Sequence, residues 1–313
     1  MEHLFIINPK SFSHKADITR FSAEVEAHFK AKDVDNFSIH ISRFPRDAVI
    51  VIKRHLMSVD PSTLVRVYAV GGAGVAFSCL NGIIGMPNAE LALLPFGTGN
   101  DFVRAFGPEH YEDFRSIACQ TAARAIPTDL IKCDGNYALN HCFIGKEASA
   151  VIHTILLNKR FEKIRRAFPS FNRLFLFLGG IAAAFDKRII AQQYEIIADG
   201  EDLSGEYNSI NIANGRYYAN GKTSVPQAVP DDGFLDMLIS KNPSPLGVLA
   251  GARSSLRVYR RIKKVTIRSD TALFVNIDDE LFFDTHLEVE VIPRAVSIVS
   301  VGALQYEGTA NEQ

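Results

Sequence analysis

The sequence has few cysteines and no long apolar run, and each shortage argues against a class of protein. The four cysteines show neither CxxC spacing nor paired histidines, so we expect no zinc site but buried free thiols (Cys79, Cys119, Cys133 and Cys142). No apolar run is long enough to span a bilayer, and the N-terminus lacks the basic flank of a signal peptide. The formal net charge of -1 gives no reason to expect a nucleic-acid partner. These features predict a cytoplasmic protein, and 313 residues suffice for two domains.

The first 126 residues alternate between strand and helix patterns. Apolar runs at 3–8, 37–42, 64–70 and 90–96 are typical of buried strands, and helical patterns follow them. Short connections between strand and helix imply right-handed crossovers and a parallel sheet that is covered on both faces. We therefore predict an α/β domain over residues 1–126, with ligands at the carboxyl ends of its strands.

From residue 127 onward, the pattern changes to strands separated by turn residues. This pattern predicts an antiparallel, β-rich domain over residues 127–294. A helical region at about 147–187 interrupts it. The apolar piece at the C-terminus could return to either domain, so residues 295–313 are assigned provisionally to the first.

Two glycine turns follow neighbouring strands of the predicted parallel sheet. "GGAG" (71–74) follows the third strand and "GTGND" (97–101) follows the fourth. Glycine lets backbone N–H groups approach a phosphate, and a helix N-terminus adds further donors. Tight turns use glycine anyway, but two such turns at one sheet edge favour a polyphosphate site. Neither turn is a P-loop, because neither contains Gly-Lys-Ser/Thr, and a dinucleotide fingerprint fails because Phe77 takes the place of its third glycine.

Longer segments carry a family resemblance. They are "IINP" (6–9), "GGAG", "LNG" (80–82), "LPFGTGNDFVRAFG" (94–107), "NGRYYANGKTSVPQAVPDDGFLD" (214–236) and "IDDE" (277–280). The chain resembles the diacylglycerol kinase catalytic-domain family, which includes bacterial lipid kinases and sphingosine kinases and is related in fold to NAD kinases. The resemblance covers nearly the whole chain. It implies a nucleotide-binding α/β domain and a β-rich lipid-substrate domain, with γ-phosphoryl transfer from ATP to a lipid hydroxyl, such as that of diacylglycerol, with Mg²⁺.

The resemblance also implies roles for individual residues. Glu280 would be the general base, and Asp101 would assist catalysis at the metal or the substrate. A nucleotide would be held by Asn8, Gly71, Gly72, Gly74, Thr98, Gly99 and Asn100. A second, structural Mg²⁺ would lie near Asp231, Asp232 and Asp236.

Each acidic position also has a structural interpretation. Asp101 could cap the following helix, and Glu280 could stand in a hairpin turn with solvated acids. Asp231 and Asp232 before Gly233 have an ordinary turn composition.

The chain departs from the family pattern Gly-Gly-Asp-Gly-Thr at the first glycine turn. Ala73 replaces the aspartate, Val75 the threonine, and Phe77–Ser78 a following Asn-Glu pair; Asp279 replaces the glycine of the family's "DGE" segment. A carboxylate that organises magnesium is commonly worth several kcal/mol, so its loss predicts a rate roughly a hundredfold lower. Three explanations remain: an active kinase that uses Asp101, Asp279 and Glu280, a pseudokinase that binds nucleotide or lipid, or an engineered Ala73. An NAD kinase-like enzyme is a further alternative.

The segment 158–188 is rich in both basic and aromatic residues. Phenylalanines accompany the cations Lys159, Arg160, Lys163, Arg165 and Arg166, a composition that favours an anionic membrane surface. A second basic stretch at 253–264 could reinforce that surface. For residues 174–185 we instead predict a core helix of the second domain. The sequence thus predicts a cytoplasmic protein that is peripheral to the membrane. An enzyme that acts on a soluble substrate such as NAD would not require a membrane-binding surface.

Overall fold

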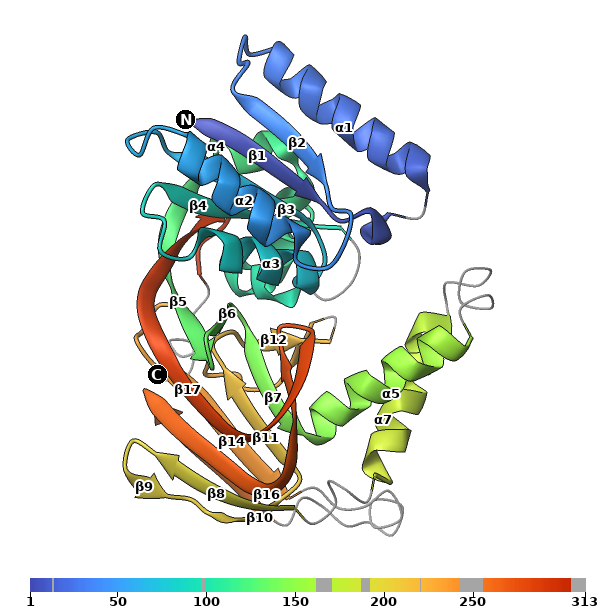
Figure 1. Cartoon of the computed structure of the whole chain (residues 1–313), viewed down its shortest axis with the longest axis vertical. Coiled ribbons are helices and arrows are strands. Elements are labelled where there is room, and N and C mark those ends of the chain that lie inside the picture. The colour runs from blue at the N-terminus through green and yellow to red at the C-terminus, as the bar shows by residue number, and fades with distance from the viewer. Residues whose placement is uncertain are drawn as a thin grey trace, which may run out of the picture.

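The structure is a computed structural model that describes residues 1–12, 14–96, 100–161, 171–186, 192–219, 221–241 and 256–304. It contains an α/β domain, a β-rich domain below it and a helical hairpin that projects from the β-rich domain (Figure 1). In the described part of the chain, no helix is long and apolar enough to cross a membrane. All four cysteines are free thiols; three are buried as predicted, whereas Cys119 is half-buried.

The α/β domain is built on four parallel strands in the order β4-β3-β1-β2. These are β1 (Glu2–Ile7), β2 (Phe37–Ile41), β3 (Val65–Gly71) and β4 (Ala89–Pro95). Side chains of α2 (Asp47–Ser58) and α3 (Ala73–Ile83) share one core cluster with the sheet, and those of α1 (Lys15–Lys30) and α4 (Ile117–Ala122) share another. Every residue of β3 and β4 is buried, because helices cover both faces of the sheet. The predicted parallel α/β architecture is confirmed.

The β-rich domain is antiparallel, as predicted. Its strands follow the order β15-β14-β11-β7-β16-β17. They are β7 (His141–Gly145), β11 (Ser209–Ala213), β14 (Leu235–Lys241), β15 (Leu256–Ile262), β16 (Lys264–Ile277) and β17 (Glu280–Ser300). Shorter strands complete the domain: β6 (Asn136–Ala138), β8 (Gln192–Ala198), β9 (Glu201–Asp202), β10 (Gly205–Tyr207), β12 (Tyr217–Tyr218) and β13 (Lys222–Thr223).

Strand β17 belongs to both domains. Its first half pairs with β16, and the following residues pair with β5 (Arg124–Cys133). Near its end, Ile298 pairs with Leu91 of β4 in the parallel sheet. One sheet therefore runs through both domains, and the long red strand in Figure 1 shows this continuity. Strand β5 runs across residue 126, so the strands mark no break at that position. The predicted domain boundary at residue 126 therefore stays a prediction.

The helical region consists of α5 (Lys146–Arg160) and α7 (Phe171–Ala184). The two helices cross closely at Gly179, where a Cβ atom would lie 2.8 Å from the carbonyl oxygen of Ala150. The prediction of a core helix at 174–185 is wrong. In the described part, α7 buries only a narrow face against α5, including Phe175 and Ala183, and its other large apolar side chains are exposed.

Candidate functional site

The first glycine turn needs its leading glycine. Gly71 has φ +154°, and a Cβ atom there would lie 2.7 Å from both Ser11 Oγ and Val75 Cγ1. No other residue fits this close approach. The Asn8 amide donates to the carbonyl oxygen of Val70 (3.0 Å), and the Asn8 side chain accepts from the Lys10 amide (3.0 Å). The end of β1 is thereby fixed beside the glycine turn, as the sequence predicts.

Helix α3 begins directly at this turn. Gly72 occupies its N-cap position, and no side chain caps the helix there. The first N–H groups of a helix have no partner within the helix, so this end can donate to an anion. The first turn of α3 contains no acidic residue, because Ala73 stands in it. The backbone geometry of a phosphate cradle is thus present without the family's carboxylate.

The second glycine turn approaches the first through Asn100. This residue is buried, and its Nδ2 donates to the carbonyl oxygen of Gly71 at 3.4 Å. Gly97, Thr98 and Gly99 lie outside the described residues. Asp101 is buried and forms an ion pair with Arg104 (Oδ1 to Nε, 3.0 Å). The helix expected here is a 3-10 helix at Asp101–Phe106, and Asn100, not Asp101, holds its N-cap position.

Glu280 follows a two-residue hairpin turn between β16 and β17. Both turn residues have left-handed backbones, with φ +44° at Asp278 and +70° at Asp279. Such turns favour Asn-Gly or Asp-Gly, so Asp279 occupies a position that suits glycine better. The Asp278 carboxylate accepts from the backbone amides of Leu139 (2.6 Å) and His141 (3.0 Å). The hairpin predicted as an alternative is therefore present, and it is fixed to neighbouring backbone.

The hairpin brings Glu280 to the glycine turn of the other domain. A Cβ atom built on Gly74 would have Glu280 Oε1 as its nearest contact, at 4.0 Å. Solvent reaches Asp279. The protein around it nevertheless desolvates the carboxylate and, with the negative charges of Asp278, Asp101 and Glu280, raises its pKa to about 7. Residues far apart in the sequence thus form one acidic site beside the cradle.

The third predicted group, Asp231, Asp232 and Asp236, is engaged by the protein itself. Asp232 forms an ion pair with Arg261 (2.6 Å), and Asp236 is buried and accepts from the Tyr259 hydroxyl. Desolvation raises the pKa of both carboxyls. Asp231 is half-buried. Within the described ranges, no group of three or more His, Cys, Asp or Glu residues is arranged to hold a metal ion. A structural magnesium there stays a prediction.

Sequence reasoning missed two buried residues that shape the site. Asp129 accepts from the backbone amides of Gly233 (2.6 Å) and Arg294 (2.7 Å). His141 hydrogen-bonds Asn211 Oδ1 and the Tyr217 carbonyl, both at 3.1 Å, and burial lowers its pKa to about 4. The only available signal was a polar residue within an apolar strand segment, as in "IPTDLI".

An anion cradle on one domain, faced by a carboxylate on the other, is an arrangement that phosphoryl transfer to a hydroxyl can use. The sequence profile of the diacylglycerol kinase catalytic domain matches residues 2–133. That of the YegS C-terminal NAD kinase beta sandwich-like domain matches residues 181–300. The chain belongs to the diacylglycerol kinase catalytic-domain family and is a kinase-type phosphotransferase of the lipid kinase class.

Similar proteins agree with this assignment. A "Putative lipid kinase" of Staphylococcus aureus strain Newman is 25% identical over 252 residues, which are 76% of this chain and 77% of that protein. The crystal structure of a diacylglycerol kinase from Bacillus anthracis superimposes with a TM-score of 0.62 at 20% identity, covering 96% of each chain. A second Bacillus anthracis structure gives a TM-score of 0.67 at 21% identity, again over 96% of each chain. The structural matches establish the shared fold.

Proposed function

We propose that this chain is an ATP-dependent kinase that transfers the γ-phosphoryl group to a lipid hydroxyl such as that of diacylglycerol. The observation that carries the proposal is the position of Glu280, whose Oε1 lies beside Gly74 at the start of α3. A phosphate cradle and a proton acceptor are the two elements that phosphoryl transfer to a hydroxyl requires.

The glycine turns bind the nucleotide in this proposal. Backbone N–H groups from Gly72 to Gly74 donate to phosphate oxygens, and the helix dipole of α3 favours their negative charge. Asn100 holds the backbone of Gly71 through its amide. Asn8 keeps the end of β1 in register with this turn. This binding needs no side chain at position 73, so it survives the replacement of the family's aspartate by Ala73.

Glu280 acts as the general base. Its carboxylate takes the proton of the lipid hydroxyl while the hydroxyl oxygen attacks the γ-phosphorus. The new oxygen–phosphorus bond forms as the bond to the bridging oxygen of ADP breaks, and ADP leaves with that electron pair. The backbone contacts of Asp278 hold the hairpin, and through it Glu280, in place.

The acidic residues of the site fit a magnesium ion. Carboxylate oxygens are the ligands that Mg²⁺ prefers, and one or two of them suffice when substrate phosphates and water complete the shell. Asp101 and Asp279 would supply these oxygens: Asp101 follows Asn100, which bonds the Gly71 carbonyl, and Asp279 precedes Glu280, which lies beside Gly74. When bound, the ion neutralises the charge that develops between the β- and γ-phosphates.

Transfer of labelled phosphate from ATP to diacylglycerol in mixed micelles tests the proposal. We expect activity in the unaltered chain and a loss of about a hundredfold or more in Glu280→Gln, since an aligned base contributes 10²–10⁴-fold. Glu288→Gln, on the same strand but paired with Lys264, is the matched control and should keep full activity. Full activity in Glu280→Gln would remove Glu280 from the mechanism.

Ala73 supports a second candidate function, a pseudokinase that binds nucleotide or lipid without transfer. In that case the unaltered chain binds ATP but is silent in the same assay. If Ala73→Asp then restores transfer, the rest of the kinase site is intact, and the missing carboxylate alone accounts for the inactivity of the unaltered chain. If both proteins are silent with diacylglycerol and with other lipid acceptors, the kinase proposal fails.

A further inference from the structure

Helix α7 carries a continuous stripe of exposed apolar side chains. They follow one another at helical spacing: Leu174 (43% exposed), Phe177 (66%), Leu178 (38%), Ile181 (41%) and Phe185 (52%). Residues three and four apart lie on the same face of a helix. Ile155 and Leu156 of α5 and the neighbouring Phe161 are exposed as well. The helical hairpin thus displays eight of the sixteen large apolar side chains that are exposed on the described surface.

The stripe is not the face with which the two helices pack. That face contains Phe175, Gly179 and Ala183, again at helical spacing. Thr154 of α5 lies against it, with its Oγ1 3.5 Å from the carbonyl oxygen of Phe175. Helix packing therefore uses one side of α7 and leaves the apolar stripe on another.

The charges of the hairpin are complementary to an anionic surface. Lys159 and Arg160 end α5 in exposed positions. The acidic residues Glu147 and Asp186 lie at the other end of the helical hairpin and are engaged there: Glu147 accepts from the Ser209 hydroxyl (2.6 Å), and Asp186 accepts from the Ser149 hydroxyl (3.1 Å). Lys163, Arg165 and Arg166 lie outside the described residues, as does Glu162. Cations beside exposed aromatic and aliphatic side chains suit a bilayer interface.

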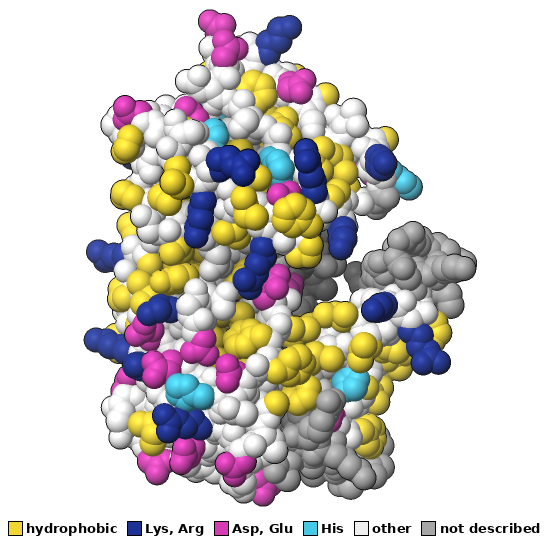
Figure 2. All heavy atoms as spheres, in the orientation of Figure 1, with side chains coloured by type: hydrophobic (Ala, Val, Ile, Leu, Met, Phe, Trp, Pro, Cys, Tyr) yellow, Lys and Arg dark blue, Asp and Glu magenta, His cyan; other side chains and the backbone are white. Residues whose placement is uncertain are grey.

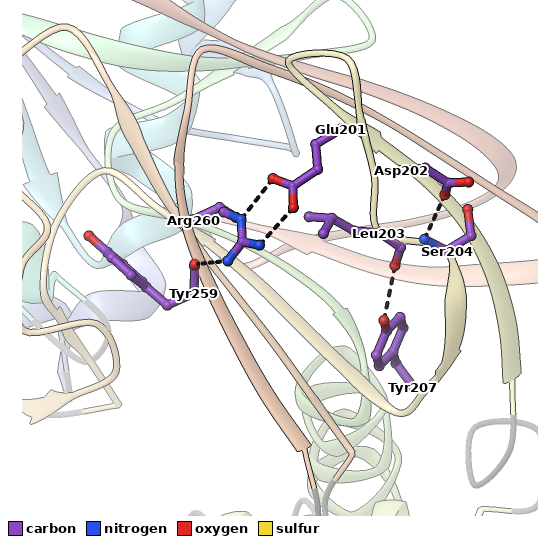
Figure 3. A network of polar contacts seen from close by, with 7 residues as sticks. All are labelled: Glu201, Asp202, Leu203, Ser204, Tyr207, Tyr259 and Arg260. Carbon is purple, nitrogen blue, oxygen red and sulfur yellow. Dashed lines mark hydrogen bonds and ion pairs between the residues drawn. The ribbon is translucent and has the colours of Figure 1, made fainter.

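Three cations of the second basic stretch are paired with acids. Arg260 donates two hydrogen bonds to Glu201, from Nε to Oε2 (2.8 Å) and from NH2 to Oε1 (2.7 Å) (Figure 3). Arg261 is paired with Asp232 and Lys264 with Glu288. The expectation that 253–264 would reinforce a membrane face is therefore not supported for these three cations, and the hairpin carries the argument.

Apolar contacts join the helical hairpin to the second domain. Ala148 and Ile152 of α5 pack against Phe274 of β16. Phe274 in turn contacts the exposed Phe283 ring edge-on, with centroids 5.2 Å apart. Figure 2 shows hydrophobic side chains gathered where the hairpin meets the second domain.

We propose that the apolar stripe of α7, with the exposed end of α5, is a membrane-docking surface that enters the interface of an anionic bilayer. The cations contact lipid headgroups, and the apolar side chains reach the acyl boundary. The choice of a lipid surface as occupant rests on the proposed function. Docking itself needs neither ATP nor catalysis, so the two proposals can fail separately.

Vesicle flotation of the full chain tests docking directly. The vesicles contain phosphatidylcholine alone or phosphatidylcholine with phosphatidylglycerol, and no ATP is added. We expect flotation with the anionic vesicles and little with the neutral ones. The double variant Phe177→Ser/Ile181→Ser should bind about tenfold more weakly for each side chain removed, because each loses most of its apolar burial in the lipid. The reversal Lys159→Glu/Arg160→Glu should weaken binding to anionic vesicles specifically.

The matched control is Ile50→Ser/Met57→Ser on α2. These two apolar side chains are equally exposed or more so (51% and 80%) but lie on the other domain. We expect this control to float like the unaltered chain. Circular dichroism and thermal melting establish that all variants are folded. Absence of flotation in the unaltered chain, equal flotation of the hairpin and control variants, or a dimer that only the hairpin variant dissociates would overturn the proposal.

Discussion

At the scale of single residues, the site carries two replacements, one in each domain, beside the contact of Gly74 with Glu280. The family's aspartate is absent at Ala73, and a carboxylate stands at Asp279 where the family has glycine. Asp279 interacts electrostatically with Asp101 and Glu280, whereas the first turn of α3 has no acid. Compared with the family pattern, the site thus lacks an acidic residue in the glycine turn and has an additional one in the turn between β16 and β17.

Asp279→Gly should separate the effect of Asp279 on stability from its contribution to metal binding and catalysis. Glycine accepts φ +70° without strain and removes a like charge, so we expect stability to rise by up to about 1 kcal/mol. Because a carboxylate oxygen is lost, we expect kinase activity to fall about tenfold or more and Mn²⁺–ATP binding, followed by electron paramagnetic resonance, to weaken. Unchanged metal binding together with unchanged activity would show that Asp279 serves neither.

His3 gives the α/β domain a pH-dependent stability. It is buried and hydrogen-bonded to the Tyr68 hydroxyl (2.8 Å), and burial lowers its pKa to about 4. Between pH 6.5 and 4 the unfolded chain takes up a proton that the folded chain does not, so stability is complete above this window and decreases as the pH falls through it.

The expected loss between pH 7 and pH 5 is about 2 kcal/mol from this residue. His3→Asn should flatten the dependence of unfolding free energy on pH, measured by urea denaturation across that range. The replacement should also lower stability at pH 7, because the ring contacts of His3 with Phe29 are lost. A slope as steep as that of the unaltered chain would mean that His3 takes up its proton in the folded state.

At the scale of secondary-structure elements, much of the fold could be predicted from the sequence. The four parallel strands were found within a residue or two, because a fully buried strand is a short apolar run with turn residues at its ends. The glycine turns were found because glycine there meets a local requirement, such as the close approach at Gly71. Local patterns carry local structure well.

What depended on distant parts of the chain was not predictable. The position of Glu280 beside Gly74 follows from the path of β17 through both domains. The exposure of α7 follows from the absence of a partner for its outer face, whereas its composition alone suggests a core helix. The bonds of Asp129 to Gly233 and Arg294 likewise join segments that are far apart in sequence.

The Asn81 side chain joins helix α3 to the second domain through two hydrogen bonds. Asn81 Nδ2 donates to the Tyr137 carbonyl (2.8 Å), and the Tyr137 amide donates to Asn81 Oδ1 (3.0 Å). Asn81→Ala leaves both backbone groups of β6 without these partners, so we expect a loss of about 2–3 kcal/mol in unfolding free energy. Asn88→Ala, which removes a single bond to Thr63, should cost less. Equal effects in urea denaturation would show that the Asn81 bonds do not dock the helix.

At the scale of the whole molecule, the two domains share both a sheet and a core. Strand β17 pairs with β16 in the second domain and with β4 in the first. Phe77 extends from α3 into the hydrophobic cluster of the second domain, together with Ile131 and Ile277. The replacement of the family's asparagine by Phe77 therefore has a structural use, since an apolar ring here joins the domain with the phosphate cradle to the domain with Glu280.

This shared core should make the molecule unfold as a unit. We expect scanning calorimetry to give one transition for the unaltered chain, because neither half of the sheet can separate without breaking β17. Phe77→Ala should destabilise the chain by about 3–5 kcal/mol through the cavity it leaves, and it should also weaken the coupling between the domains. ATP should then raise the melting temperature of the whole unaltered chain, since a ligand of one domain stabilises everything that unfolds with it. Two resolved transitions in the unaltered chain, of which ATP shifts only one, would mean that β17 and Phe77 connect the domains without coupling them.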